Sequence, residues 1–179
     1  MARVHLSGRG TRLLVLGHGA GGGIDALDLQ AAKRAALDLG WRVALVEQPW
    51  RVRGAKVAEA PPRLDQAWLE VLARLRAGTL VVGGRSAGAR AACRTAAQTG
   101  AAAVLCLAFP LHPPGRPDRS RLPELEQVTV PTLVVQGSKD PFGVPPGAVV
   151  IKDADHSFRS QAAAQQVHAI VTAWLQAVT

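Results

Sequence analysis

Residues 79–99 of the chain read TLVVGGRSAGARAACRTAAQT. The apolar run at 80–82 predicts a buried strand, and the alanine-rich run after it predicts a helix. Between the two lies a G-x-S-x-G motif at 84–88, with Ser86 at its centre. A sharp strand-to-helix turn that exposes a serine hydroxyl leaves no room for side chains two positions before and after the serine, which explains both glycines. The alternative interpretation is a tight turn in which Ser86 caps the helix.

Apolar runs and helical periods alternate along the rest of the chain. Further strands are expected at 2–6, 12–16, 41–46, 101–109, 131–136 and 148–152, helices at 25–39, 61–78, 122–126 and 160–178, and a loop at 47–53. Near-continuous apolar strands that alternate with amphipathic helices indicate a mostly parallel sheet with helices on both faces. We therefore predict an α/β fold with about six to seven strands, in a single domain spanning residues 1–179.

A glycine-rich loop, GHGAGGG at 17–23, follows the strand expected at 12–16. Three interpretations are open: a phosphate-binding loop, a flexible turn, or an oxyanion loop in which a backbone N–H faces a reacting carbonyl. The absence of a Gly-Lys-Ser/Thr sequence disfavours the phosphate-binding loop. His18 is expected to hold this loop by hydrogen bonds rather than to act as a base.

Two further loops carry candidate catalytic side chains. Asp140 follows one expected strand, and His156 follows the next. The carboxyl ends of parallel strands lie at one edge of the sheet, so Ser86, Asp140 and His156 are expected to come together there. A serine hydroxyl needs a base to take its proton, and the base needs an acid that fixes its tautomer. The distance from His156 to each of the other two side chains should therefore be about 2.6–3.2 Å.

Asp153 and Asp155 are rivals of Asp140 for the role of the acid. Asp155 adjoins His156 in the sequence, which makes a good side-chain hydrogen bond to the ring awkward, and Asp153 is the fallback. Asp140 precedes a proline and is either a rigidly placed carboxylate or a turn-forming Asp-Pro.

The composition limits the other classes of function. The formal charge is +8, from 21 basic and 13 acidic residues, but the basic residues are scattered and aromatic residues make up only 4%. A nucleic-acid partner is therefore not expected.

No uncharged run approaches the ~20 residues needed to cross a bilayer, so no membrane partner is expected either. The first residues show no secretory signal, and we expect a cytoplasmic protein. Cys93 and Cys106 have no metal-like spacing and are expected to be buried, unpaired core residues, so no metal site is predicted. No cofactor is expected either.

The chain resembles a small alpha/beta-hydrolase, most closely the compact, lidless group often labelled dienelactone-hydrolase-like. It is also similar to the hydrolase-like domain of a subunit of the nonspecific-lethal histone-acetyltransferase complex. The matching stretches are GHGAGGG at 17–23, EQPWRV at 47–52, GGRSAGAR at 83–90, FPLHPPG at 109–115, QGSKDPFG at 136–143 and DADHSF at 153–158. The resemblance implies that Ser86 is the nucleophile, Asp140 the acid and His156 the base, with the backbone N–H groups of Ala20 and Ala87 forming the oxyanion hole.

The sequence also departs from this group. Dienelactone hydrolases use cysteine as the nucleophile where this chain has Ser86, so their substrate cannot be transferred to it. No segment is long enough for a lid domain, which predicts a shallow, open site. The residues expected to line the substrate pocket are His18, Trp50, Arg85 and His112, while Arg90 either braces neighbouring loops or binds a substrate anion.

The sequence therefore predicts a serine hydrolase that acts on a small-molecule acyl substrate. The substrate would be an ester, thioester or lactone, cleaved through an acyl-enzyme. The alternative is an interaction module with the hydrolase fold and little turnover, because a fold does not by itself establish a function.

Overall fold

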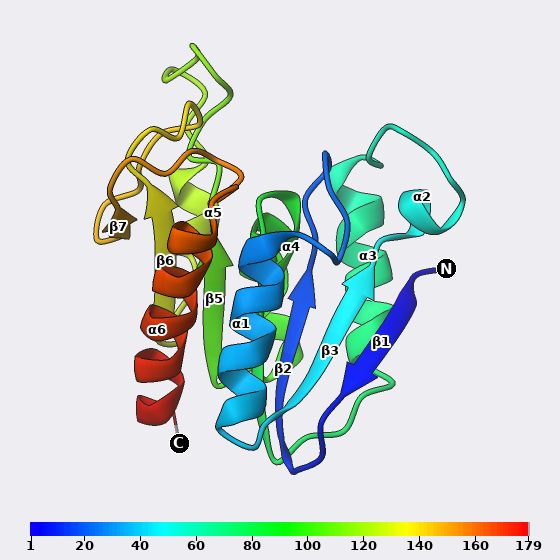
Figure 1. The fold of residues 1–179 in the computed structure, drawn as a ribbon. Helices are drawn as coiled ribbons and strands as arrows, with labels where there is room; N and C mark the ends of the chain where they lie inside the picture. The colour runs from blue at the N-terminus through cyan, green and yellow to red at the C-terminus, as the bar shows by residue number, and fades with distance from the viewer. Residues whose placement is uncertain (179) are drawn as a thin grey trace.

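The computed structural model describes residues 1–178 and contains one sheet in the order β1-β3-β2-β4-β5-β6-β7 (Figure 1). The strands are β1 (Arg3–Ser7), β2 (Arg12–Gly17), β3 (Arg42–Glu47), β4 (Thr79–Arg85), β5 (Ala103–Leu107), β6 (Thr132–Gly137) and β7 (Val149–Ile151). The edge strand β1 runs antiparallel to β3, and every other neighbouring pair is parallel. The predicted mostly parallel sheet is therefore confirmed.

Helices cover both faces of the sheet. α1 (Leu27–Asp38) and α6 (Gln161–Ala177) lie side by side in front of the strands in Figure 1. On the opposite face α3 (Pro61–Leu72) packs against α4 (Ala87–Thr99), and the short α5 (Leu122–Glu126) packs against α4 as well. The expected loop at 47–53 contains a short helix, α2 (Pro49–Val52), because Pro49 fixes a φ suited to a first helical turn.

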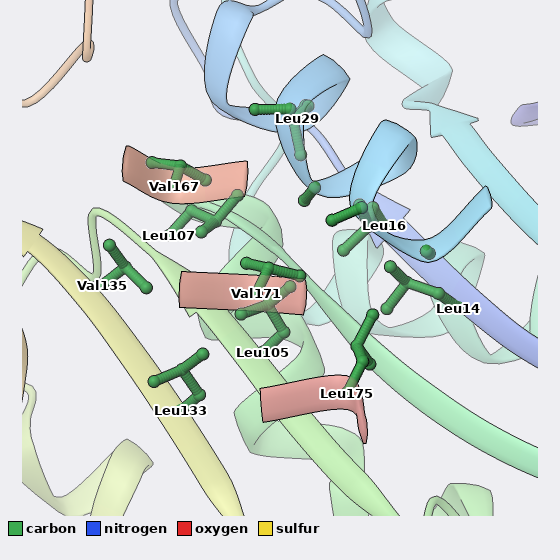
Figure 2. Packing of buried hydrophobic residues seen from close by; sticks show 14 of the residues in the cluster. Leu14, Leu16, Leu29, Leu105, Leu107, Leu133, Val135, Val167, Val171 and Leu175 are labelled. Atoms are coloured by element: carbon green, nitrogen blue, oxygen red, sulfur yellow. The ribbon is translucent and has the colours of Figure 1, made fainter. Parts of the chain in front are cut away.

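The core forms one layer on each side of the sheet, because successive side chains of a strand point to opposite faces. In β2, Leu14 and Leu16 belong to the layer under α1 and α6, whereas Leu13 and Val15 belong to the layer under α3 and α4. Each such fully buried side chain stabilises the fold by about 1.5–3 kcal/mol. Figure 2 shows the first layer, which includes Leu16, Leu29, Leu105, Leu107, Val167 and Val171.

Cys93 of α4 and Cys106 of β5 meet inside the second layer. Both are buried free thiols, and their Sγ atoms lie 3.4 Å apart. The hydrogen bond with Cys93 and burial together raise the pKa of the Cys106 thiol. The prediction that both cysteines are buried and unpaired is confirmed.

Loops follow the carboxyl ends of β2, β5, β6 and β7. Between β5 and β6, residues 108–131 carry only the short α5, and within the described range 1–178 no domain is inserted over this edge.

In the same range no helix is both long and apolar enough to cross a membrane. Nor does this range group three or more His, Cys, Asp or Glu side chains in a way that could hold a metal ion.

Candidate active site

Ser86 occupies the turn between β4 and α4. Its backbone has φ 53° and ψ −111°, a conformation that residues with a Cβ atom rarely adopt. A Cβ atom on either Gly84 or Gly88 would overlap the carbonyl oxygen of Gly17 in the neighbouring strand β2. The contact between the turn and β2 therefore requires both glycines of the G-x-S-x-G motif. The Ser86 side chain makes no capping hydrogen bond to α4, which excludes the interpretation as a capped turn.

The Ser86 hydroxyl faces His156, and His156 in turn faces Asp140. Ser86 Oγ lies 3.1 Å from His156 Nε2, and His156 Nδ1 lies 2.8 Å from Asp140 Oδ2. Because its partner is a carboxylate, Nδ1 carries the proton, and Nε2 is then free to accept from the serine hydroxyl. The Asp140 side chain is fully buried, and the His156 side chain is 16% exposed. The three residues selected from the sequence thus form one hydrogen-bonded chain at the expected distances.

The two rival acids are engaged elsewhere. The Asp153 carboxylate pairs with Lys139 at 2.7 Å, in an exposed ion pair. The Asp155 carboxylate accepts from the Ser157 N–H at 2.9 Å. The structure therefore places Asp140, and neither rival, at the imidazole.

Asp140 is held by groups that the sequence analysis did not single out. Its Oδ1 accepts from the Phe142 N–H at 2.8 Å, and its Oδ2 accepts from the Gln136 side-chain amide at 2.7 Å. The Phe142 ring packs on the imidazole of His156, with ring centroids 4.2 Å apart and planes inclined by 35°. The position of Gln136 near the end of an otherwise apolar strand was a signal that could have identified it. Phe142 had no comparable signal.

His18 lies beneath the glycine-rich loop and is fully buried. Its Nδ1 donates to the Gly19 carbonyl at 2.8 Å, and its Nε2 accepts from the Gln48 N–H at 2.9 Å. Burial lowers the pKa of His18, which favours the neutral ring that these two bonds require. The Trp50 ring, 1% exposed, packs edge-on against it at a centroid distance of 5.2 Å. The pocket role predicted for His18 and Trp50 is corrected on this ground, because both brace the loop from inside.

The backbone N–H groups of Ala20 and Ala87 were the predicted oxyanion donors. Ala20 is exposed in the glycine-rich loop, and Ala87 is the first residue of α4. Within residues 1–178 neither N–H donates to a backbone acceptor in a turn, loop or cap. The N-terminus of α4 adds partial positive charge beside Ser86. Their role in binding an oxyanion stays a prediction.

Both arginines that flank Ser86 are held by protein acceptors. Arg85 is 6% exposed, its Nε lies 2.9 Å from Asp28 Oδ2, and its Nη2 donates to the His156 carbonyl at 2.8 Å. The pocket role predicted for Arg85 is therefore corrected to an internal one. Arg90 donates two hydrogen bonds to Glu124, of 2.8 and 2.6 Å, and so attaches α5 to α4. Of its two expected roles, Arg90 thus makes the contacts of a brace.

His112 is half-buried beside the loop that carries Asp140. Its Nδ1 donates to the Pro113 carbonyl at 2.9 Å, and its backbone N–H donates to the Phe142 carbonyl at 3.0 Å. A Cβ atom on Gly143 would lie 2.6 Å from the Nε2 atom of His112, so the ring rests directly on this glycine. Its role as a pocket wall stays a prediction.

Comparisons with known proteins agree with this architecture. A serine hydrolase homologue from Coxiella burnetii superposes with a TM-score of 0.79 at 17% identity, over 97% of this chain and 91% of that one. A serine hydrolase without a lid from Xanthomonas campestris superposes with a TM-score of 0.76 at 20% identity, over 98% of this chain and 88% of that one. Est1E from Butyrivibrio proteoclasticus, with ferulic acid bound, superposes with a TM-score of 0.75 at 14% identity, over 99% of this chain and 95% of that one.

The structural similarities, at such low identity, demonstrate a shared fold alone. No curated protein sequence matches the chain at a significant level. A family model described as "Alpha/beta hydrolase domain", however, matches residues 10–177, from just before β2 to the end of α6. Because that match covers nearly the whole chain, the protein belongs to the alpha/beta hydrolase family.

Proposed function

We propose that this chain is a serine hydrolase that cleaves a small ester, thioester or lactone through an acyl-enzyme. The observation that carries the proposal is the chain of hydrogen bonds from Ser86 through His156 to Asp140. A hydroxyl bonded to a neutral imidazole, which is itself bonded to a buried carboxylate, is the arrangement that makes serine a nucleophile near neutral pH.

In the first half-reaction Ser86 Oγ attacks the substrate carbonyl carbon while His156 Nε2 takes the hydroxyl proton. Asp140 stabilises the imidazolium that forms, because it accepts the Nδ1–H bond throughout. The N–H groups of Ala20 and Ala87 would receive the negative oxygen of the tetrahedral intermediate. The bond to the leaving oxygen or sulfur then breaks, and His156 protonates that atom, which leaves the acyl group on Ser86.

Water completes the reaction. His156 Nε2 removes a proton from a water molecule as the water oxygen attacks the acyl carbon. The ester bond to Ser86 breaks, and the proton returns from His156 to Ser86 Oγ. One water is consumed, and the products are a carboxylic acid with an alcohol or thiol, or one hydroxy acid from a lactone.

The lack of a covering domain within the described residues supports a small substrate. Ser86 is partly exposed at the carboxyl edge of the sheet, and residues 1–178 contain no inserted domain that would cover a long acyl chain. His18 and Trp50 lie inside the loop layer, where they support the glycine-rich loop from below. Because a fold neighbour holds ferulic acid, phenolic esters belong in the test panel beside p-nitrophenyl esters, thioesters and lactones.

A fluorophosphonate probe and the ester panel test the proposal directly. We expect the probe to label the wild-type protein and not Ser86→Ala, and hydrolysis of the best ester to fall by about 10⁴- to 10⁶-fold in Ser86→Ala. Equal rates for the two proteins would refute the proposal. A folded wild-type protein that is neither labelled nor active would instead favour the interaction module.

A further inference from the structure

The Arg85 guanidinium meets three segments that lie far apart in the sequence. Its Nη2 donates to the backbone carbonyl of His156 at 2.8 Å, and its Nε lies 2.9 Å from Asp28 Oδ2 in α1. Its Nη1 lies beneath the glycine-rich loop, where a Cβ atom on Gly19 would be 3.2 Å away and one on Gly22 would be 3.8 Å away. Arg85 also directly precedes the serine in the chain. One side chain next to Ser86 therefore bonds the His156 segment, pairs with α1 and lies beneath the glycine-rich loop.

We propose that Arg85, held by Asp28, is a positioning residue that fixes His156 and the glycine-rich loop relative to Ser86. This inference rests on the proposed function, since it assigns a supporting role in that reaction. His156 needs such support because it lies outside the regular elements, in the connection between β7 and α6. Its side chain is bound by Asp140, and the hydrogen bond from Arg85 holds its backbone as well.

Asp28 makes it possible for a charged guanidinium to lie under the loop. Its side chain is fully buried, and the Arg85 side chain is 8% exposed, so the two charges compensate each other out of contact with water. Burial raises the pKa of Asp28 to about 6, and the nearby Arg85 opposes this rise. The position of Asp28 in the first turn of α1 also favours the ionised carboxylate through the helix dipole.

The geometry of the contacts requires arginine rather than a positive charge alone. A guanidinium directs N–H groups along fixed directions in one plane, whereas a lysine ammonium is a single point of charge on a flexible stem. Arg85→Lys can keep the ion pair with Asp28, but it cannot also bond the His156 carbonyl and fill the space under Gly19. Arg85→Lys therefore keeps the positive charge at residue 85 and removes the planar set of N–H donors, so it tests the donor geometry alone.

The experiment compares Arg85→Lys with Arg116→Lys, a matched control in an exposed ion pair with Asp118. Three readouts are needed: the rate of fluorophosphonate labelling, kcat and KM for the best ester, and the proton NMR resonance of His156 Nδ1–H. That resonance is identified by its loss in His156→Gln. Because misplacement of a catalytic group by about 1 Å can cost on the order of 100-fold, we expect labelling and kcat to fall about 10- to 100-fold in Arg85→Lys. KM should stay within about twofold, the resonance should broaden or shift, and the control should match the wild type.

Two results would overturn the inference: an unchanged labelling rate and resonance in Arg85→Lys, or a KM that rises while kcat is unchanged, which would make residue 85 a substrate contact. If Arg85→Lys does not fold, the double variant with Asp28→Asn and Arg85→Met takes its place, because it removes both buried charges together. Wild-type kcat and resonance in that double variant would refute the positioning role, and their loss in a folded protein would support it. A wild-type protein that reacts with neither probe nor ester refutes the proposed function, while the resonance still tests the inference.

Discussion

Gln136 donates to the same Asp140 oxygen that binds the His156 imidazole. The Gln136 amide nitrogen lies 2.7 Å from Asp140 Oδ2, and His156 Nδ1 lies 2.8 Å from that atom. The same amide lies 2.9 Å from the Gly143 carbonyl, so Gln136 also holds the loop that follows the acid. The carboxylate is thereby fixed in one orientation, with Oδ2 aimed at the ring.

Gln136→Leu removes this donor while keeping most of the side-chain volume. We expect kcat to fall by about 10- to 100-fold, because Asp140 is free to rotate away from the imidazole. The free energy of unfolding should fall by about 1–3 kcal/mol, because buried acceptors lose their partner. Steady-state kinetics and urea unfolding measure the two effects, with the exposed Gln127→Leu as control. A rate equal to that of the control would show that Phe142 and His156 suffice to orient the carboxylate.

Two substitutions of Ser86 distinguish the loss of the hydroxyl, which affects turnover, from the relief of backbone strain, which affects the free energy of unfolding. With φ at 53°, a residue bearing a Cβ atom is strained at this position, which costs on the order of 1–3 kcal/mol. Ser86→Gly and Ser86→Ala should both abolish turnover, but Ser86→Gly should have a free energy of unfolding about 1 kcal/mol higher than Ser86→Ala. Urea unfolding of the two variants tests this. Equal stabilities would mean that the turn is relaxed.

Gly88→Ala should prevent the protein from folding. The added Cβ would overlap the Gly17 carbonyl oxygen, and backbone in a central strand cannot move aside without breaking the sheet. Gly21→Ala is the matched control, because a Cβ there meets no atom within 4 Å. We expect Gly88→Ala to be lost from the soluble fraction and Gly21→Ala to accumulate like the wild type. A folded Gly88→Ala protein with wild-type stability would contradict the packing described for the turn.

The protein should become less stable in mild acid because His18 binds a proton more readily in the unfolded chain than in the folded protein. Its pKa in the folded state lies below the ordinary value of 6.5, so below that pH the unfolded chain binds a proton that the folded protein does not. The free energy of unfolding therefore decreases as the pH falls through about 6.5. Urea unfolding between pH 7.5 and 5 of the wild type and of His18→Asn measures this contribution.

The comparison with His18→Asn also removes the effect of other groups. The pKa of Asp28, raised to about 6, gives a slope of opposite sign, because the folded state binds that proton more readily than the unfolded chain. Since this contribution is present in both proteins, it cancels in their difference. Parallel pH profiles would show that His18 takes up a proton equally in the folded and unfolded states.

The two cysteines should resist alkylation in the native protein. Cys93 is 1% exposed and Cys106 is fully buried, and the raised pKa of Cys106 disfavours the thiolate that reacts. We expect iodoacetamide to modify neither residue in buffer and both in urea, as measured by mass spectrometry. Rapid modification under native conditions would reveal opening of the layer between α4 and β5.

Sequence patterns predicted the sheet and the grouping of Ser86, His156 and Asp140 because both depend on local signals. Each apolar run identifies a strand without knowledge of the others, and parallel topology then brings the following loops to one edge. This reasoning placed Ser86, Asp140 and His156 together although they come from three separate loops. The G-x-S-x-G motif added the turn, whose glycines are dictated by a contact with β2.

The direction of side chains within those loops could not be predicted in the same way. His18, Trp50 and Arg85 were correctly located near the site, yet whether a loop side chain points outward or inward depends on partners that fold against it from elsewhere. For Arg85 that partner is Asp28, whose position in a helical pattern resembles that of an ordinary exposed carboxylate. Only the packed structure shows that it is fully buried.

The close approach of Gly17 to Gly84 and Gly88 also indicates where the protein can be altered and where it cannot. Backbone packs against backbone there, so the turn at Ser86 and the start of the glycine-rich loop are in direct contact, and no side chain in the contact can be substituted. Engineering for new substrates should therefore leave both stretches untouched. The exposed residues 53–57, between α2 and α3, and 114–120, between β5 and α5, are the places to diversify.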